Sequence, residues 1–324
     1  MTLLSVENLD VAYGTEENSV YAVKNVSFSL RPGEFLGIVG ESGCGKSTLG
    51  YAITRLLRNP GRIAGGRVLF EGQDLATLPE KEIRRLRWKE FSLVMQSGMN
   101  ALNPVLSIRK QFEDTFEAHT NYSKSEMRTR TQELLDMVNI DPSFADRYPH
   151  ELSGGMKQRV AIALALALNP KLVLMDEPTT ALDVVVQRSI LQNLKKLREQ
   201  HQFAVIFISH DLGTVLEMAD RIAVMYAGKF VEVEPSRALL EKPLHPYSEA
   251  LLGCFADPRQ EKIEIRGIPG SPPNMKNPPK GCPFAARCDY ALPVCLEKDP
   301  ILESFGTAQV ACHLAGERFG GGEK

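Results

Sequence analysis

Residues 40–47 read Gly40-Glu41-Ser42-Gly43-Cys44-Gly45-Lys46-Ser47 and match the pattern G-x-x-x-x-G-K-[ST]. The apolar run Phe35–Val39 precedes this stretch and predicts a buried strand, and a helix is expected to begin near Ser47. Glycines let the backbone N–H groups of such a loop point at phosphate oxygens, and the start of the helix adds the positive end of its dipole. The stretch therefore predicts a phosphate-binding loop between a strand and a helix.

Strands and helices alternate around this loop through about residue 240. Similar short apolar runs occur at Leu172–Met175, Val205–Ile208 and Ile222–Met225. Runs of this kind are typical of parallel strands that are buried on both faces. Apolar residues recur at helical spacing in Ser125–Val138 and in residues 186–197. The pattern predicts an α/β core, and the short alternating segments of Leu4–Leu30 predict an antiparallel β layer.

Bulk composition narrows the classes of function. The chain has 324 residues, enough for about two domains, and its 43% hydrophobic and 24% charged residues allow an ordinary folded core. A net charge of -2 argues against a general nucleic-acid binder. No apolar run approaches the ~20 residues needed to cross a bilayer, and the first residues do not resemble a signal peptide. Any membrane role is therefore expected to depend on partners, with the chain on the cytoplasmic side.

Two acidic residues, Asp176 and Glu177, follow the apolar run that begins at Leu172. Charges at the end of a buried strand are costly unless a cation or solvent compensates them. Asp176 is predicted to help hold Mg²⁺, and Glu177 to act as a general base toward water. Lys46 is predicted to reach the β- and γ-phosphates, and Ser47 to bind Mg²⁺. The alternative is a strand end with solvated acids.

The stretch Leu152–Arg159, which reads Leu-Ser-Gly-Gly-Met-Lys-Gln-Arg, resembles the signature sequence of ABC ATPases. Ser153, Gly154 and Gly155 precede a helical pattern and form a second candidate anion site, since a helix N-terminus favours negative charge. In the resembling family this stretch completes the ATP site of a partner chain across a dimer. The resemblance therefore implies an ATPase that closes as a dimer around ATP and Mg²⁺.

Other residues match the family in order along the chain. The resemblance implies that Tyr13 stacks on adenine, that Gln96 contacts Mg²⁺ and the attacking water, and that His210 contacts the γ-phosphate. Asp183 matches the loop that links the two sites. ATP contacts are implied for Gly40, Glu41, Ser42, Gly43, Cys44, Gly45, Lys46, Ser47 and Thr48. The implied fold is a P-loop α/β core with an antiparallel β layer, spanning residues 1–256, and a helical subdomain at about 97–160.

The segments after residue 240 resemble the ATPases of oligopeptide and dipeptide importers. The resemblance rests on Leu244–Leu252, Ile268–Pro273 and Gly281–Cys288. It implies permease subunits as partners, a second ATPase chain that is identical or paralogous, and an external substrate-binding protein, with no nucleic acid. An oligosaccharide or nickel importer is an alternative, and a soluble ABC ATPase acting on DNA or ribosomes is a further one. Gln96–Pro104 is expected to dock on the permease, at the cytoplasmic face of the membrane.

Four of the six cysteines lie close together in the extension expected at residues 257–324. They are Cys282, Cys288, Cys295 and Cys312. In a reducing compartment such a group suggests a metal more than disulfides. The spacing matches neither ferredoxin motifs nor a zinc ribbon. The resemblance to the importer ATPases implies a [4Fe–4S] cluster, with zinc and uncoordinated or disulfide-linked thiols as alternatives, and Arg287 and Lys280 are expected to offset its charge.

Overall fold

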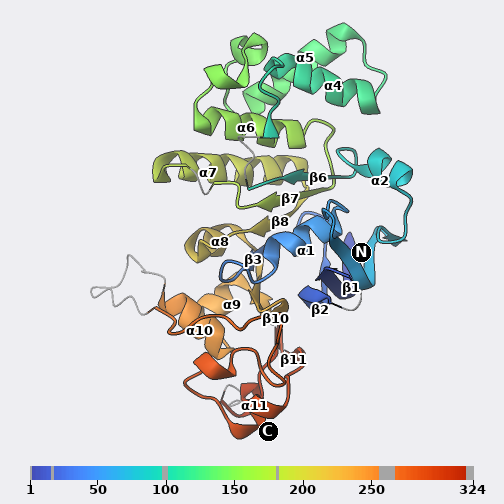
Figure 1. Ribbon diagram of the computed structural model, residues 1–324. Helices are drawn as coiled ribbons and strands as arrows, with labels where there is room; N and C mark the ends of the chain where they lie inside the picture. The colour runs from blue at the N-terminus through green and yellow to red at the C-terminus, as the bar shows by residue number, and fades with distance from the viewer. Residues whose placement is uncertain (1, 16–17, 97–100, 180–181, 255–266, 319–324) are drawn as a thin grey trace. The chain divides into compact units, whose positions relative to one another are not determined.

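The computed structural model describes residues 2–15, 18–96, 101–179, 182–254 and 267–318 (Figure 1). The chain divides into two compact units, and each is described by itself. Unit 1 consists of Met1–Leu3, Leu30–Glu34 and Thr77–Phe207, and unit 2 of Leu4–Ser29, Phe35–Ala76 and Ile208–Lys324. Within the described residues, no helix has the length and apolar character needed to span a membrane.

Unit 2 contains the antiparallel β layer predicted for the N-terminal region. Its strand order is β2-β1-β4-β5, and β1 pairs antiparallel with β4. The strands are β1 (Leu4–Tyr13), β2 (Val20–Leu30), β4 (Gly61–Phe70) and β5 (Gln73–Asp74). Alternating burial along β1 fits a strand with one face in the core. This layer carries Tyr13 at the end of β1.

A second set of strands in unit 2 has the order β11-β12-β10-β9-β3. β3 and β9 are parallel, whereas β10 pairs antiparallel with both β9 and β12. These strands are β3 (Phe35–Val39), β9 (Arg221–Tyr226), β10 (Lys229–Pro235), β11 (Glu303–Phe305) and β12 (Ala308–Val310). The helices of unit 2 are α1 (Lys46–Ile53), α8 (Leu212–Met218), α9 (Ser236–Glu241), α10 (Pro246–Gly253), α11 (Pro293–Glu297) and α12 (Ala315–Arg318). The predicted strands at residues 35–39 and 222–225 are confirmed.

The C-terminal segment is built onto unit 2 through β10. Glu232 on β10 is fully buried, and its carboxylate accepts hydrogen bonds from the backbone N–H groups of Leu244 (2.5 Å) and His245 (3.0 Å). Burial raises the pKa of Glu232, and hydrogen bonds from the chain partly oppose the rise. On the facing strand β12, Ala308 and Val310 form a small apolar core with Ala315. The segment therefore shares the sheet of unit 2, although the expected boundary at residues 256 and 257 lies outside the described residues.

Unit 1 holds parallel strands and a helical layer. Its strands have the order β8-β7-β6, with β6 parallel to β7. They are β6 (Phe91–Val94), β7 (Leu172–Asp176) and β8 (Ala204–Ile208, whose last residue is assigned to unit 2). The helices are α2 (Glu80–Leu86), α4 (Ile108–His119), α5 (Lys124–Met137), α6 (Gly154–Ala165) and α7 (Val184–His201). The predicted strands at 172–175 and 205–208 and the two predicted helices are confirmed.

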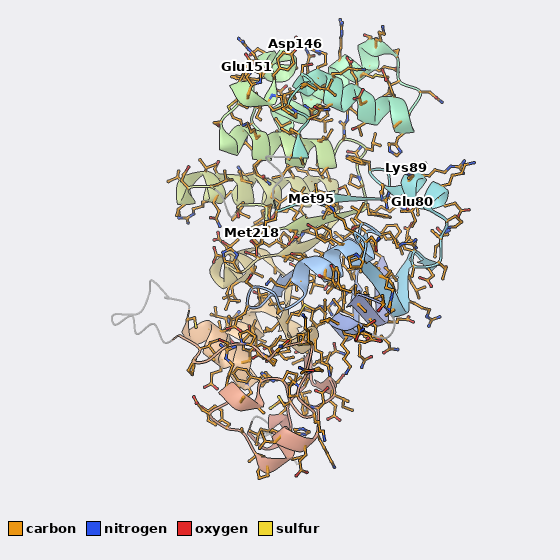
Figure 2. All side chains as sticks on the ribbon, viewed as in Figure 1. Glu80, Lys89, Met95, Asp146, Glu151 and Met218 are labelled. Carbon is orange, nitrogen blue, oxygen red and sulfur yellow. The ribbon has the colours of Figure 1, made fainter. Side chains whose placement is uncertain are left out.

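Helices α4, α5 and α6 pack together within unit 1, in the region expected to form the helical subdomain. Surface ion pairs hold the connections around these helices. Arg109 contacts Asp146 through two hydrogen bonds of 2.6 and 2.8 Å, and Arg147 pairs with Glu151 at 2.8 Å. Figure 2 labels both acidic residues, which lie beside these helices. The layer leads directly into Ser153 and the start of α6.

Candidate functional site

The phosphate loop joins β3 to α1 within unit 2. Gly40 and Gly45 have positive φ angles of 153° and 108°, and Gly45 is the N-cap of α1. A Cβ atom on Gly40 would lie 2.1 Å from the carbonyl oxygen of Met225, and one on Gly45 would lie 2.2 Å from that of Ala22. Any side chain would therefore clash with backbone at both positions, besides adopting an unfavourable φ. The backbone is packed tightly enough to hold the loop in one shape.

Lys46 lies inside this loop and is only 5% exposed. Its Nζ donates to the carbonyl oxygens of Gly40 (2.8 Å) and Glu41 (3.0 Å), and to the sulfur of Cys44 at 3.7 Å. Burial raises the pKa of the Cys44 thiol, while the neighbouring Lys46 lowers it. The ammonium is thus held by neutral acceptors, which an anionic phosphate oxygen can replace with a stronger, charge-assisted bond.

Tyr13 and Thr48 lie together in unit 2. The Tyr13 hydroxyl and the Thr48 hydroxyl are 3.3 Å apart, at hydrogen-bonding distance. The Tyr13 ring also packs against Gly61, where a Cβ atom would come 2.8 Å from ring atom Cε1. The ring is half-buried. Such a ring can present a flat surface to a base, so the expected stacking on adenine stays a prediction.

Unit 1 places the predicted base beside the predicted glutamine. β6 and β7 run parallel, with Val94 opposite Met175, so Gln96 and Glu177 both follow the carboxyl ends of their strands. Gln96 Nε2 donates to Glu177 Oε2 at 2.7 Å. Asp176 is 1% exposed and ends β7. Parallel strands present their carboxyl ends at one edge of a sheet, which is the usual position of ligand-binding groups in α/β folds.

Glu177 has a strained backbone, with a φ of +45°. Residues with a side chain adopt this region rarely, and strain of about 1–3 kcal/mol is typical of functional positions. The unusual φ angle sets the direction in which the carboxylate leaves the strand. The hydrogen bond from Gln96 then directs the carboxylate toward the end of β6. A general base needs such orientation toward its water.

The signature stretch begins helix α6 as predicted. Ser153 is the N-cap, and its hydroxyl oxygen accepts from Met156 N at 3.3 Å. The hydroxyl hydrogen remains able to donate, for example to an anion. Gly155 lies against α7, where a Cβ atom would come 2.6 Å from Val186 Cγ1. Any side chain at residue 155 would therefore separate α6 from α7.

Helix α7 begins beside this stretch. Asp183 is its N-cap and accepts from Val186 N at 3.0 Å. The next two residues, Val184 and Val185, are 78% and 79% exposed. Arg159 on α6 donates to the hydroxyl of Ser189 at 3.0 Å and so ties the two helices together. Asp183 and the signature glycines thus belong to one packed pair of helices within unit 1.

His210 follows β8 in unit 2 and is exposed. The turn around it is fixed by its neighbours, because Ser209 Oγ accepts from Asp211 N at 3.0 Å and Asp211 caps α8 through Thr214 N. The loop, Tyr13 and His210 therefore belong to unit 2, whereas Gln96, Asp176, Glu177, Ser153–Gly155 and Asp183 belong to unit 1. Of the expected permease-docking stretch Gln96–Pro104, residues 97–100 lie outside the described residues.

The four C-terminal cysteines line one small cavity. The cavity has a volume of about 10 Å³, and its walls include His245, Phe284 and Leu314 besides Cys282, Cys288, Cys295 and Cys312. Burial raises the pKa of Cys282 to about 12, and nearby thiols add to the rise. Within the described ranges, no three His, Cys, Asp or Glu side chains are spaced as ligands of a metal ion. The thiols are grouped as the sequence predicted, but around a space of roughly one water molecule.

Sequence analysis missed two residues that contact the phosphate loop. Tyr247 and Arg287 both bind Glu41, across 206 and 246 residues of chain respectively. No local pattern predicts a contact over such separations. Arg287 was expected to offset the charge of a cysteine-bound cluster, and its guanidinium instead faces the carboxylate of Glu41.

Comparison with known proteins agrees with this arrangement. Residues 23–180 match the family described as ABC transporter, and residues 231–295 match the oligopeptide/dipeptide transporter C-terminal region. The dipeptide transport ATP-binding protein DppD of Caldanaerobacter subterraneus subsp. tengcongensis is 42% identical over 96% of this chain and 97% of its own. The oligopeptide transport ATP-binding protein OppD of Bacillus subtilis is 44% identical over 92% of this chain and 84% of its own.

A solved structure shares the fold of the ATPase part. It is described as the dimeric structure of a post-hydrolysis state of the ATP-binding cassette MJ0796 bound to ADP and Pi. Its TM-score is 0.64 at 33% identity, and the match covers 72% of this chain and 99% of the other. The chain belongs to the ABC transporter family. It is an ATP-hydrolysing subunit that powers an ABC importer, and subunits of this kind lie peripherally at the cytoplasmic face of the membrane.

Proposed function

We propose that this chain drives the import of dipeptides or oligopeptides, as one of two ATPase subunits bound to a permease. The observation that supports the cargo class is the match of residues 231–295 to the oligopeptide/dipeptide transporter C-terminal region. Relatives that align with 96% and 92% of this chain carry dipeptide or oligopeptide transport in their names. An external substrate-binding protein is proposed as an indirect partner of this chain, acting through the permease. The second ATPase subunit is either a copy of this chain or a paralogue.

The proposed chemistry divides among the residues described above. Lys46 and the loop hold the phosphates, Tyr13 supports the adenine, and Ser47, Gln96 and Asp176 are the proposed ligands of Mg²⁺. Their oxygen atoms are of the kind that Mg²⁺ prefers, and the bound ion would neutralise charge on the phosphates. Glu177 takes a proton from the attacking water, and Gln96 keeps its carboxylate in position. His210 is proposed to contact the γ-phosphate.

A dimer explains features of unit 1 that one chain does not use. The N-terminus of α6 presents backbone and hydroxyl hydrogen-bond donors at Ser153, Gly154 and Gly155. We propose that these donors complete the ATP site of the partner subunit. Val184 and Val185 are exposed apolar residues next to Asp183 on the adjoining helix. Exposed apolar groups beside a ligand-binding surface are typical of an interface that closes. The partner subunit is proposed to cover them.

A reconstituted transporter tests the cargo. With the permease, both ATPase subunits and the binding protein in liposomes, we expect the peptide-loaded binding protein to stimulate ATP hydrolysis and peptide uptake. The matched controls are the same binding protein without ligand, with an oligosaccharide and with Ni²⁺. Stimulation by oligosaccharide or Ni²⁺ but not by peptides would assign the chain to one of the alternative importers. ATP turnover independent of any membrane partner would favour a soluble ABC ATPase.

The four-cysteine group is proposed to bind a metal centre, with a [4Fe–4S] cluster favoured over zinc. Four thiols around one cavity supply the complete donor set of such a cluster. Thiols bind metals as thiolates, and burial without a cation opposes their ionisation, as the raised pKa values of Cys282 and Cys312 indicate. Among the described residues, no three of these side chains are spaced as ligands of a metal ion, so the thiols must rearrange to hold one.

Metal analysis separates these alternatives. Protein purified without oxygen is expected to contain about four irons and four sulfides per chain and to absorb visible light. Cys295→Ser should lose the iron, whereas Cys254→Ser should retain it, because Cys254 does not line the cavity. If the protein contains one zinc ion per chain and no iron, the cysteines form a zinc site and not an iron–sulfur cluster. Iron bound equally by both variants would contradict any centre at these cysteines.

A further inference from the structure

Arg287 has an acceptor for each of its five N–H donors. Its Nη1 and Nη2 donate to the two carboxylate oxygens of Glu41 at 2.7 and 2.9 Å. Nη1 also donates to the Tyr226 hydroxyl at 3.2 Å, Nε to the carbonyl of Pro269 at 2.8 Å, and Nη2 to that of Ile268 at 3.2 Å. The arginine side chain is 5% exposed. Because every N–H group is hydrogen-bonded and the side chain is almost out of contact with water, the guanidinium is held in one position.

The partner of this arginine is the second residue of the phosphate loop. Glu41 is 25% exposed, so its carboxylate is only partly screened by water. A two-bond contact between guanidinium and carboxylate fixes both planes as well as the distance between them. The hydrogen bonds to Glu41 also raise the pKa of Arg287 further above its usual range. The side chain of Glu41 is therefore held by Arg287 of the C-terminal segment.

Tyr247 holds the backbone at the same residue. Its hydroxyl oxygen accepts a hydrogen bond from Glu41 N at 2.9 Å. The ring is fully buried on α10, where its centroid lies 4.6 Å from that of Tyr226 and 5.3 Å from that of Phe284. Aromatic packing of this kind leaves the hydroxyl little freedom. The N–H of Glu41 is thus occupied by a rigid group outside the loop.

These contacts reach the phosphate-binding lysine through one residue, Glu41. The carbonyl oxygen of Glu41 accepts from Lys46 Nζ, while the N–H and the carboxylate of the same residue are held by Tyr247 and Arg287. Displacing Glu41 must therefore move an acceptor of the lysine. Glu41 and Lys46 are only five positions apart in the sequence.

We propose that Arg287 and Tyr247 are positioning residues for the phosphate loop, so that the affinity for ATP depends on the C-terminal segment. Neither side chain needs to touch the nucleotide. They hold Glu41 in place and thereby keep the loop in the shape that receives phosphates. The proposal rests on the role of residues 40–47 as the ATP phosphate loop.

The test measures Mg-ATP binding by the full-length chain. Arg287→Met removes the charge and the hydrogen bonds with a similar volume, and we expect the Kd for Mg-ATP to rise about tenfold. Arg287→Lys should recover part of the affinity, because it restores the charge without the two-bond geometry. In the assembled transporter, KM for ATP should rise while kcat at saturating ATP stays within about twofold of wild type.

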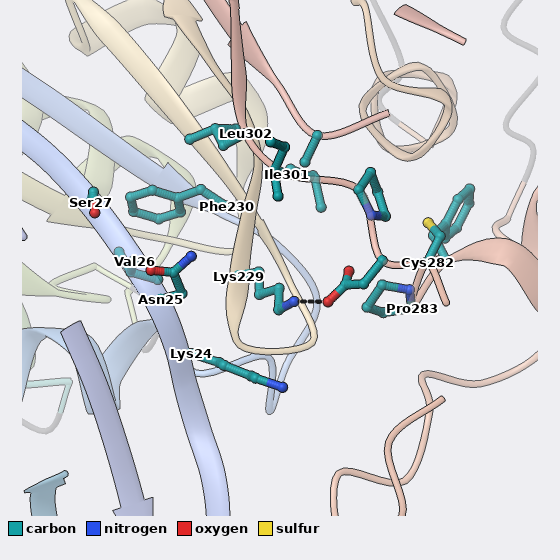
Figure 3. A pocket seen from close by; sticks show the side chains of 15 residues that line it. Lys24, Asn25, Val26, Ser27, Lys229, Phe230, Cys282, Pro283, Ile301 and Leu302 are labelled. Atoms are coloured by element: carbon teal, nitrogen blue, oxygen red, sulfur yellow. Dashed lines mark hydrogen bonds and ion pairs between the residues drawn. The ribbon is translucent and has the colours of Figure 1, made fainter. Parts of the chain in front are cut away.

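Two further variants keep the result interpretable. Glu41→Gln leaves the other contacts of Arg287 in place and should also raise the Kd, and the Glu41→Gln/Arg287→Met double variant should be no weaker than the weaker single variant. Lys229→Met is the matched control, because the Lys229 side chain pairs with Asp299 of the C-terminal segment beside a cavity of about 200 Å³ whose lining includes no residue of the loop (Figure 3). It should bind Mg-ATP like wild type.

Unchanged affinity in both Arg287→Met and Glu41→Gln would overturn the proposal. Equal weakening by Lys229→Met would also overturn it, since any loosening of the segment would then suffice. Failure of the phosphate-loop assignment is distinguishable, because wild-type protein would then bind Mg-ATP no better than its Lys46→Ala variant.

Discussion

Glu177→Gln is expected to lower ATP turnover by about 100- to 10,000-fold while leaving ATP binding intact. The glutamine keeps the size of the side chain, and its carbonyl oxygen can still accept from Gln96 Nε2, which lies 2.7 Å from Glu177 Oε2. Only the capacity to take a proton is lost. Turnover is measured in the assembled transporter, and binding by titration with Mg-ATP.

Glu90→Gln is the matched control for this variant. Glu90 forms an ion pair with Lys171 at 3.1 Å. The two residues directly precede the parallel strands β6 and β7. Removing this carboxylate should leave turnover close to wild type, because it lies at the opposite end of β6. Undiminished hydrolysis by Glu177→Gln would remove Glu177 from the role of general base.

Lys46→Ala is expected to weaken Mg-ATP binding itself, by about 10- to 100-fold. The variant removes the charge that would bind phosphate, and it leaves the carbonyl oxygens of Gly40 and Glu41 without their common donor. The loop should therefore lose both affinity and shape. Titration with Mg-ATP measures the affinity, and thermal unfolding shows whether the rest of the chain stays folded.

An exposed lysine supplies the control. Lys24→Ala removes one positive charge from the same unit at an exposed position on β2. It should bind Mg-ATP as wild type does. A Lys46→Ala protein with normal affinity, or a Lys24→Ala protein that is equally weak, would contradict direct binding of phosphate by Lys46.

The features predictable from the sequence were those that depend on neighbouring residues. Buried strands, the glycine loop and the Ser153 cap are set by short patterns of apolar, small and hydroxyl residues, and the structure confirms each of them. The positive φ of Glu177 is local too, but no pattern around it distinguishes that conformation. The role of Glu177 could therefore be predicted from the sequence, whereas its strained backbone conformation could not.

Features that depend on distant contacts could not be predicted. Strand β12 pairs with β10, and its apolar residues pack with Leu244 and Ala315, but no local pattern in the sequence predicts this pairing. Strand pairing across such separations is decided by the whole fold. The same holds for Arg287, whose partner at residue 41 could not be chosen from among the many acidic residues of the chain.

The contact between Glu41 and Arg287 also has a consequence for biosynthesis. The two residues are separated by 246 positions, so a ribosome that adds about 5–20 residues per second makes the arginine roughly 12–50 s after the glutamate. The loop therefore leaves the ribosome well before one of its supports has been made. A nascent chain is therefore expected to lack full nucleotide-binding competence during that interval.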